Sequence, residues 1–372
     1  MKREKQIIEA LFAEAGITVN GVRPWDPRVH HEDFYGRVLR QGSIGLGESY
    51  MDGWWDCENL DQFFYRILSA ELDQKVKKNF GLIMKIAWSR LLNPERKSRA
   101  FVIGKKHYDL GNDLFRSMLD KRLTYTCGYW PGAKNLDQAQ ENKLDLVCRK
   151  IGLRAGQRVL DIGSGWGSFM GYAAEKYGVS AVGVTVSREQ KKLADELYRD
   201  LPVETRLEDY RGVEGKFDRV VSLGMFEHVG CKNYRTFMKV AHRALKDEGL
   251  FLLHTIGSDR SSSGGADPWM AKYIFPVGMS PSIKQIGRAI EGLFVMEDWH
   301  NFGADYDRTL MAWHTNFESN WHKIKANYDE RFYRMWRYYL LICAGSFRAR
   351  KSQLWQIVLS KKGLTGGYKS VR

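Results

Sequence analysis

The residues most able to do chemistry begin at a glycine-rich turn in the middle of the chain. An apolar run ends at Asp161 and is followed by Gly163, Gly165 and Gly167, which is typical of a buried strand, a tight turn and the start of a helix. Glycine permits the backbone angles of such a turn and lets the main chain lie close to a ligand. Dinucleotide-binding domains carry an acid on the next strand, about 20 residues on, but residues 183–187 contain none. The acid before the glycines favours a site for S-adenosylmethionine (SAM), and the alternative is a purely structural turn.

A carboxylate and an imidazole lie at the ends of two later apolar stretches. Glu227 follows residues 217–223, and His254 lies near the end of residues 249–256. Side chains at the ends of adjacent strands could share one proton network. Each has a structural alternative, a helix cap for Glu227 and an internally bonded core histidine for His254. Nucleic-acid methyltransferases that act on exocyclic amines usually carry an (Asn/Asp/Ser)-Pro-Pro-(Tyr/Phe) stretch here. Residues 224–230 lack it, so a nucleic-acid base is disfavoured as substrate.

A doubly wound sheet is needed to position these residues. Short apolar stretches alternate with helical patterns from residue 158 onward, which predicts an α/β fold with a parallel sheet. The ligand of such a sheet lies over the carboxyl ends of its strands. The predicted strands are 158–163, 180–186, 203–207, 217–223, 249–256 and, at the end of the chain, 354–359. The predicted helices are 136–151, 167–177, 188–199 and 232–246.

The chain outside this sheet is predicted to form a small, mainly helical N-terminal domain over residues 1–95. A linker at 96–106 joins it to a catalytic domain at 107–372. Residues 71–92 have the pattern of a basic amphipathic helix, which is typical of a membrane surface; an ordinary helix packed on the core is the alternative. Residues 269–348 are rich in Trp, Tyr, Phe and Met. They are expected to form either a cap over an apolar substrate or an additional core layer.

The composition of the chain favours an anionic partner. Its 372 residues include 58 Lys and Arg against 44 Asp and Glu, a net charge of +14. Nucleic acid and a phospholipid surface both fit this sign. No window approaches the roughly 18 apolar residues of a spanning helix, and the N-terminus has no signal-peptide core, so a cytoplasmic protein is expected. No metal site is predicted. The cysteines lack metal-site spacing and are expected to be reduced thiols: Cys57, Cys127, Cys148, Cys231 and Cys343.

Six short motifs follow one another along the chain. They are Tyr125-Thr126-Cys127, Leu160–Gly167, Gly183–Ser187 with Gln190, Met225–Gly230, His254–Gly257 and Phe302–Tyr306. In this order they resemble the motifs of the cyclopropane-fatty-acyl-phospholipid synthases, and the mycolic acid cyclopropane synthases share the catalytic part. The similarity runs from about His107 to the C-terminus. The additional N-terminal domain matches the phospholipid-acting bacterial branch of the family.

The resemblance implies a SAM-dependent methyltransferase that adds a methylene across the cis double bond of an acyl chain in a membrane phospholipid, which forms a cyclopropane ring. An alkene is a weak nucleophile. Methyl transfer therefore leaves a carbocation that must be shielded from water and lose a proton before the ring closes. Aromatic faces can stabilise such a cation, which would give the aromatic residues of 269–348 a function.

By the same resemblance, the base is a bound bicarbonate held by Glu227, His254 and Tyr306, with backbone contacts at Cys127 and Ile256. Cys127 and Cys343 would lie near it. Neither thiol is expected to be a nucleophile, because methyl transfer to an alkene needs no covalent enzyme intermediate. The implied catalytic residues are Glu227, His254, Tyr306, Cys127 and Cys343. The implied SAM-binding residues are Tyr125, Thr126, Asp161, Gly163, Gly165, Gly167, Thr185, Gln190 and Asp209.

The chain departs from the family pattern in three small ways. Ser164 stands where the family often has Cys, Thr126 where it often has Ser, and Cys231 where it commonly has Pro. None of these changes removes an implied bicarbonate ligand. The reaction class implied by the resemblance is therefore unaffected.

The expected partners are a membrane phospholipid with an unsaturated acyl chain and an anionic membrane surface, but no nucleic acid, and the family implies a homodimer. The expected location is the cytoplasm, peripherally on the inner face of the cytoplasmic membrane. A second enzyme hypothesis stops at a methyl or methylene branch, or uses a sterol-like alkene. A non-enzymatic hypothesis is a basic protein that binds a membrane surface or nucleic acid. The presence of Glu227, His254 and Tyr306 argues against it.

Overall fold

The chain packs as two compact units. The computed structural model describes residues 2–72, 111–261, 267–276 and 278–372. The first unit holds residues 1–108, 266–276 and 313–351, and the second holds residues 109–265, 277–312 and 352–372. The predicted linker at 96–106 lies outside the described residues, as does nearly all of the predicted helix at 71–92. The predicted division into domains therefore stays a prediction.

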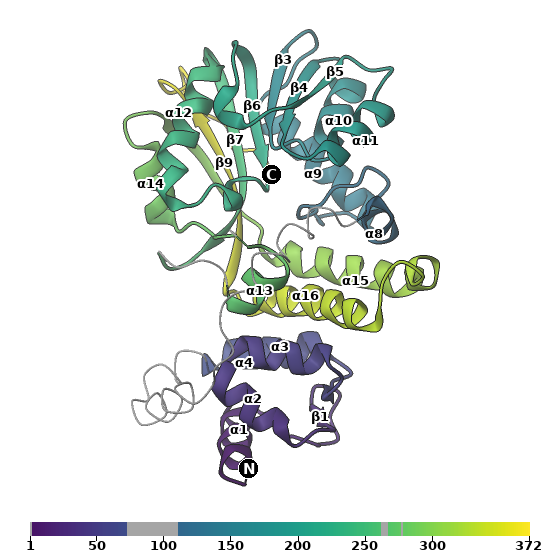
Figure 1. Cartoon of the computed structure of the whole chain (residues 1–372). Coiled ribbons are helices and arrows are strands. Elements are labelled where there is room, and N and C mark those ends of the chain that lie inside the picture. The colour runs from purple at the N-terminus through teal and green to yellow at the C-terminus, as the bar shows by residue number, and fades with distance from the viewer. Residues whose placement is uncertain (1, 73–110, 262–266, 277) are drawn as a thin grey trace. The chain divides into compact units, whose positions relative to one another are not determined.

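A seven-stranded sheet forms the centre of the second unit (Figure 1). Its strands are β3 (Arg158–Ile162), β4 (Ser180–Thr185), β5 (Val203–Leu207), β6 (Phe217–Leu223), β7 (Leu245–Ser258), β8 (Val295–Asn301) and β9 (Ser352–Ser360). They lie in the order β5-β4-β3-β6-β7-β9-β8, so the chain starts at the middle and winds outward in both directions. Strands β3 to β7 pair in parallel, whereas β9 runs antiparallel between β7 and β8.

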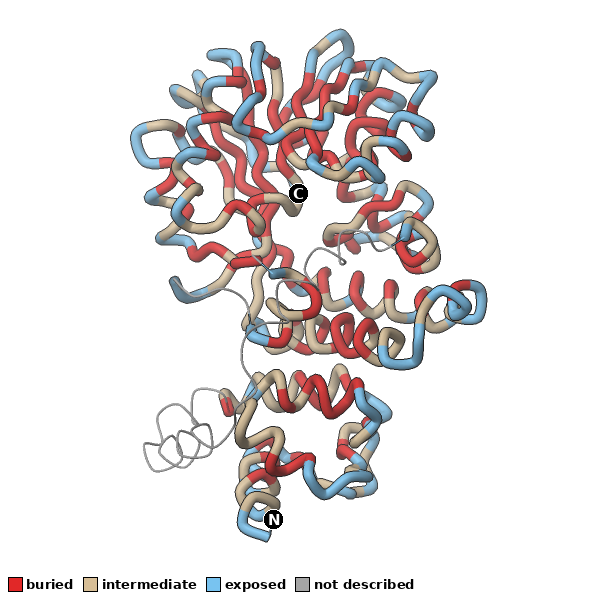
Figure 2. The backbone as a smooth tube through the Cα atoms, viewed as in Figure 1, coloured by how far each residue is buried: buried red, intermediate tan, exposed pale blue. Residues whose placement is uncertain are grey.

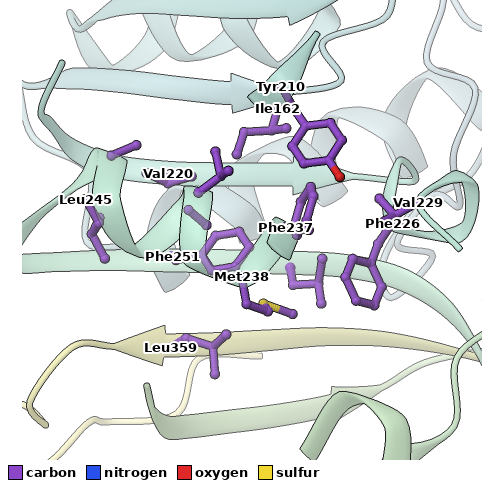
Figure 3. Close-up of a cluster of buried hydrophobic side chains, with 14 of the residues drawn as sticks. Ile162, Tyr210, Val220, Phe226, Val229, Phe237, Met238, Leu245, Phe251 and Leu359 are labelled. Carbon is purple, nitrogen blue, oxygen red and sulfur yellow. The ribbon is translucent and has the colours of Figure 1, made fainter. Parts of the chain in front are cut away.

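Helices cover both faces of this sheet. They are α9 (Leu136–Lys150), α10 (Ser168–Tyr177), α11 (Arg188–Leu197), α12 (Tyr234–Ala244) and α14 (Ile283–Ile290). The unit also contains α8 (Asn112–Met118) and the 3₁₀ turns η1 (Tyr210–Gly212), η2 (Phe226–His228) and η3 (Cys231–Asn233). On one face, Ile162, Phe251 and Leu359 of the strands pack with Phe237 and Met238 of α12 in a wholly apolar cluster (Figure 3). On the other face, strand residues pack with α9 and α10. The inner strands are consequently buried along most of their length, whereas the edge strands β5 and β8 are not (Figure 2).

The alternation of side chains along each strand places three polar residues on the α9 face. Side chains two positions apart on a strand point to the same face. Asp161, His254 and Gln356 each lie two residues from an apolar member of the cluster that packs with α9 and α10. Those apolar neighbours are Val159, Leu252 and Val358. The polar residues therefore share one side of the sheet, opposite the apolar cluster with α12.

Local signals at the helix ends explain why the elements begin and end where they do. Gly167 before α10 and Gly178 after it both have left-handed backbone angles, with φ of +82° and +63°. Asn135 caps α9, and its side chain accepts from the Gln138 N–H. Ser187 caps α11 in the same way. These residues satisfy backbone groups that would otherwise lack partners at the ends of a helix.

The first unit is mainly helical over the residues that the structure describes. It contains α1 (Lys2–Glu14), α2 (Asp33–Gln41), α3 (Ser43–Met51), α4 (Leu60–Ser69), α13 (Pro268–Tyr273), α16 (Glu330–Arg348) and a ribbon of β1 (Arg28–Val29) and β2 (Trp55–Asp56); α15 (Ala304–Ile324) contributes residues to both units. Trp269, Trp336 and Tyr338 are fully buried here, and the Tyr338 ring packs on the Phe64 ring of α4. These aromatic residues therefore form part of a core layer, which was the second of the two alternatives for residues 269–348.

The predicted elements of the sheet are confirmed, with one strand missed. All six predicted strands are present, with ends within a few residues of the predicted ones. The missed strand is β8, whose sequence includes Glu297, Asp298 and His300. Asp298 is buried because the Arg372 guanidinium and the Ser370 hydroxyl both donate to it. These C-terminal partners lie far from β8 in the sequence, so the pattern of β8 alone could not predict a strand.

Two helical glycines should respond oppositely to alanine. A Cβ at Gly47 of α3 would lie 2.3 Å from the Trp269 ring, whereas a Cβ at Gly287 of α14 would meet nothing within 4 Å. We expect Gly47→Ala to destabilise the protein by about 1–3 kcal/mol through overpacking. Gly287→Ala should stabilise it by about 0.5–1 kcal/mol, because alanine is the better helix former. Thermal unfolding of both variants tests this, and a Gly47→Ala variant at least as stable as the parent would contradict it.

Candidate active site

The glycine turn lies at the carboxyl end of β3 and has the geometry of a ligand-binding turn. Gly163, Gly165 and Gly167 all have positive φ. The N–H groups of Gly163 and Ser164 donate to the carbonyl of Val184 on β4, at 3.0 and 3.1 Å. A Cβ at Gly163 would lie 2.6 Å from the Met225 side chain, whereas a Cβ at Gly165 would meet nothing within 4 Å. There is thus no room for a side chain at Gly163, because Met225 packs against it. The space beside Gly165 is open, and a ligand could approach the backbone there.

Two further residues that are implied to bind SAM, Thr185 and Gln190, lie at and just after the end of β4. The Thr185 hydroxyl donates to the Gln190 side-chain oxygen at 2.8 Å. Gln190 lies in the first turn of α11, and its N–H donates to the Ser187 side chain that caps this helix. The Gln190 amide nitrogen is thereby oriented as a donor, which suits an acceptor on a ligand such as a hydroxyl or a carboxylate.

Asp209 follows β5 and is more exposed than the other residues that are implied to bind SAM. Its carboxylate caps η1 by accepting from the Arg211 N–H, and it pairs with the Arg211 guanidinium at 3.0 Å. The residue lies at the expected edge of the sheet. Its carboxylate is already engaged by Arg211, and its implied contact with SAM stays a prediction.

The Tyr125–Thr126 segment is held between α9 and the end of β6. The Gln140 side chain of α9 donates to the Thr126 carbonyl at 2.7 Å. The Thr126 methyl group lies so close to Gly224, the residue after β6, that a Cβ there would be only 2.6 Å from it. Tyr125 packs edge-on against Phe115, which in turn contacts Trp166 of the glycine turn. The structure therefore brings this segment to the same edge of the sheet as the glycine turn.

Glu227 and His254 lie at or near the carboxyl ends of the adjacent strands β6 and β7, as predicted. Glu227 lies in η2, just after β6, and the Ile256 N–H of β7 donates to its Oε1 at 2.6 Å. His254 is level with the last residue of β6 in the strand register. Both side chains are buried, and among the described residues Glu227 Oε2 and His254 Nε2 have no hydrogen-bond partner. Ile256, implied as a direct bicarbonate contact, uses its N–H on Glu227.

Burial shifts the pKa values of both groups toward their neutral forms. Loss of hydration raises the pKa of Glu227 to about 7, although the hydrogen bond from Ile256 acts in the opposite direction. Burial also lowers the pKa of His254 well below its ordinary value, and the positive charges of Lys143 and Lys150 add to this effect. The imidazole is therefore neutral, and the carboxyl group titrates near neutral pH. This combination suits an acid and base site better than an ion pair.

Gln356 sets the tautomer of His254, and sequence reasoning missed it. Its side-chain nitrogen lies 3.4 Å from His254 Nδ1, and the two residues are directly paired between β9 and β7. An amide NH₂ can only donate, so Nδ1 accepts and the ring proton is on Nε2. The unpartnered Nε2–H is then a donor. A single glutamine in the otherwise apolar stretch 354–359 was the signal that could have identified it.

Thr309 of α15 is a second residue that sequence reasoning missed, and it fixes the segment that contains Cys127. Its hydroxyl oxygen accepts from the Gly128 N–H at 3.1 Å and from the Trp130 indole N–H at 2.9 Å, and it donates to the Asp305 carbonyl. The Cys127 thiol lies 3.9 Å from the same oxygen. Tyr306, one helical turn before Thr309, is buried. No sequence pattern marks Thr309, because its main partners Gly128 and Trp130 are far from it in the sequence.

The thiols of the two implied cysteines are protonated. Burial raises the pKa of Cys127 well above its ordinary value and that of Cys343 to about 12. Cys127 lies in the second unit, and Cys343 lies on α16 in the first. The implied proximity of Cys343 to the bicarbonate stays a prediction. So does the expectation that neither thiol acts as a nucleophile, with which the protonated state agrees. All five cysteines are unpaired.

The other chemistry of the site can be described briefly. Within the described residues, no group of three or more His, Cys, Asp and Glu side chains could hold a metal ion. The His254 ring lies 6.0 Å from the Phe302 ring, which is 5.4 Å from the Tyr129 ring. The His254 ring therefore has aromatic neighbours.

Comparisons with known proteins agree with this geometry. A family model described as mycolic acid cyclopropane synthetase matches residues 95–357. The chain belongs to this family. The predicted resemblance and enzyme class, a SAM-dependent cyclopropane synthase, are thereby confirmed. The predicted SAM-dependent methyltransferase fold is confirmed by the similar structures.

Three proteins similar to this member of the cyclopropane synthetase family illustrate the match. The chain is 54% identical to the cyclopropane-fatty-acyl-phospholipid synthase of Escherichia coli K12 over 367 aligned residues. The alignment covers 99% of this chain and 96% of that protein. The structure of the cyclopropane synthase MmaA2 from Mycobacterium tuberculosis has a TM-score of 0.66 at 30% identity, covering 72% of this chain and 100% of that one. The mycolic acid cyclopropane synthase CmaA1 complexed with SAH and CTAB has a TM-score of 0.65 at 31% identity, covering 72% and 99%.

The hydroxyl of Thr309 should matter more to this family member than its methyl group. Thr309→Val leaves the buried Gly128 N–H and Trp130 indole N–H without their acceptor, so we expect it to lower the free energy of unfolding by about 2–3 kcal/mol. Thr309→Ser keeps the hydroxyl and should cost about 1 kcal/mol or less. Urea denaturation measures both. Equal stability of the Val and Ser variants would contradict the assigned role.

The raised pKa of Glu227 should make the ligand-free protein less stable at higher pH. The pKa of Glu227 is about 7 in the folded protein and 4.5 in the unfolded chain, so the folded protein keeps the carboxyl proton to a higher pH. Stability from this group is therefore present at low pH and falls as the pH rises through that window. Glu227→Gln should raise the free energy of unfolding by about 3 kcal/mol near pH 8 and by under about 1 kcal/mol near pH 5. Urea denaturation at both pH values measures the difference, and a difference independent of pH would contradict the assignment.

Proposed function

We propose that the chain transfers a methylene from SAM to the cis double bond of an unsaturated acyl chain in a membrane phospholipid, forming a cyclopropane ring. The observation that carries the proposal is the pair of buried atoms Glu227 Oε2 and His254 Nε2, which have no partner among the described residues. Buried polar atoms without partners are costly in a structural core and indicate a ligand. The family assignment names the chemistry that this ligand site would serve.

The residues around these two atoms fit a small anion. Neutral His254 would donate through Nε2–H, and the raised pKa of Glu227 lets its carboxyl group be protonated and donate as well. Residues two apart on a strand are separated by about 7 Å. The Ile256 N–H donates to Glu227, and Ile256 lies two residues after His254. One small ligand could therefore bridge the side chains of Glu227 and His254. Bicarbonate bound there would supply the base that accepts the proton of the cation.

The remaining residues of the proposed site orient and protect the reacting groups. Gln356 would keep the Nε2–H of His254 as a donor, and Ile256 would hold Glu227 through its backbone N–H. Tyr306, carried by the helix that Thr309 fixes to residues 127–130, would be the third contact to the anion. Phe302 and Tyr129 offer aromatic faces beside His254 that can stabilise a developing cation and exclude water.

Membrane association is part of the proposal. In the part of the chain that the structure describes, no helix is both long and apolar enough to cross a bilayer. The net charge of +14 supports attraction to anionic lipid on the inner face of the cytoplasmic membrane, at about 1 kcal/mol for each basic residue near the surface. We also propose that the enzyme acts as a homodimer.

Vesicles with defined acyl chains test the proposed reaction. We expect phospholipid with cis-unsaturated chains, incubated with SAM and the protein, to gain one CH₂ and lose the alkene without reduction, as measured by mass spectrometry and proton NMR of the product. Vesicles with saturated chains serve as the control. A methyl or methylene branch that retains an alkene, or no change in the lipid, would contradict ring formation. Removing carbon dioxide should slow the reaction, and added bicarbonate should restore it.

Glu227→Gln separates the proposed chemistry from donor binding. The variant cannot act in proton transfer, so we expect ring formation to fall by about 10²-fold or more. Calorimetric affinity for S-adenosylhomocysteine should stay near that of the parent. Glu214→Gln, at an exposed position, is the matched control and should keep full activity. Turnover of Glu227→Gln at the parent rate would contradict the proposed role of this carboxyl group.

A further inference from the structure

A buried lysine lies beside the donor turn and has no role in the function described so far. Lys143, in the middle of α9, is fully buried. Its Nζ donates to the Thr126 hydroxyl at 2.8 Å. Among the described residues, no carboxylate lies within the 4.0 Å of an ion pair with it. An ammonium has three donors, and burying one without an anionic partner is costly. The position therefore suggests that a ligand supplies the missing negative charge.

The surroundings of Lys143 contain a matching buried acid. Asp161, at the end of β3, is 2% exposed and its Oδ1 has no partner among the described residues. Its side chain is on the sheet face that α9 covers. Burial raises the pKa of Asp161 to about 7, and the positive charge of Lys143 acts in the opposite direction. Asp120, the other acid near this lysine, is already bonded to the N–H groups of Arg122 and Thr124. Asp161 and Lys143 are thus an acid and a base that are buried near each other without being paired.

Thr126 lies where it can relay the lysine charge toward a ligand. Its oxygen accepts from Lys143, so its own proton remains to be donated. Gln140, one turn earlier on α9, holds the Thr126 carbonyl, and the Thr126 methyl group packs on Gly224 at the end of β6. The hydroxyl is therefore fixed near the carboxyl end of the sheet, where the glycine turn and Asp161 also lie.

The methionine end of SAM is a zwitterion with one ammonium and one carboxylate. We propose that Lys143 is a positioning residue for this end of the methyl donor: it acts through the Thr126 hydroxyl, which donates to the donor's carboxylate, while Asp161 accepts from the donor's ammonium. The inference rests on the proposed function only in taking SAM as the ligand of the turn. Burial lowers the pKa of Lys143 to about 8, so the side chain is mostly charged at neutral pH, as this role requires.

Two product analogues distinguish charge recognition from simple support of the fold. S-adenosylhomocysteine carries the zwitterion, whereas 5′-methylthioadenosine has the same adenosine and sulfur without it. For Lys143→Met, we expect calorimetry to show about a tenfold to hundredfold loss of affinity for S-adenosylhomocysteine, the range of a hydrogen bond to a charged group. Affinity for 5′-methylthioadenosine should stay within about twofold. An equal loss for both analogues, or no loss for either, would overturn the proposal.

Lys150→Met is the matched control, because Lys150 is also fully buried on α9 but lies beside His300 and Asp298. It should lower stability and leave the ratio of the two affinities unchanged. Should Lys143→Met fail to fold, Thr126→Val and Thr126→Ser give the same test. The valine variant should lose affinity selectively for S-adenosylhomocysteine, and the serine variant should retain it. Equal affinities of the Val and Ser variants would overturn the relay.

These measurements need no acyl acceptor, so the inference and the proposed reaction can fail separately. A parent protein that binds S-adenosylhomocysteine, with no selective effect of Lys143→Met, overturns only the role of this lysine. A parent protein that does not bind S-adenosylhomocysteine overturns both. Absence of ring product from vesicles, with selective binding intact, overturns the reaction alone.

Discussion

The hydrogen bond from the Ile256 N–H to Glu227 is the interaction on which the site depends. It joins the end of β6 to β7 and holds a buried carboxyl group. Oε1 of this group accepts a hydrogen bond, whereas Oε2 has no partner among the described residues. A buried carboxyl group with incomplete hydrogen bonding lowers stability, and its raised pKa expresses this cost. The register between β6 and β7 places His254 near this group. A shift of one residue in that register would turn His254 to the opposite face of the sheet.

The two faces of the sheet have different functions because side chains alternate along its strands. The face toward α12 is apolar and packs in the larger of the two clusters on this sheet (Figure 3). The face toward α9 is apolar at mid-strand but has Asp161, His254 and Gln356 at or near the carboxyl ends of the parallel strands. The antiparallel strand β9 adds Gln356 next to His254, which a purely parallel sheet of five strands would not provide. The added strand therefore serves the site as well as the core.

Much of the fold could be predicted from the sequence, since apolar stretches bounded by turn residues mark strands such as β3, β4 and the second half of β7. The glycine turn, Glu227 and His254 were also predictable, because each lies at or near the end of an apolar stretch, at the edge where ligands bind. Strand β8 was not, because its buried Asp298 depends on Arg372. Lys143 and Thr309 were missed for a related reason. A lysine or threonine on a helix is usually a solvated side chain, and only tertiary contacts show that these two are buried.

A crystal structure of the protein with S-adenosylhomocysteine and bicarbonate tests the central claim most directly. The account predicts density for one small planar anion that lies about 2.7–3.0 Å from both Glu227 Oε2 and His254 Nε2. It also predicts that the Gln356 amide remains on Nδ1 of His254. If the two atoms bond to each other or turn to separate protein partners, with no anion between them, the account is contradicted.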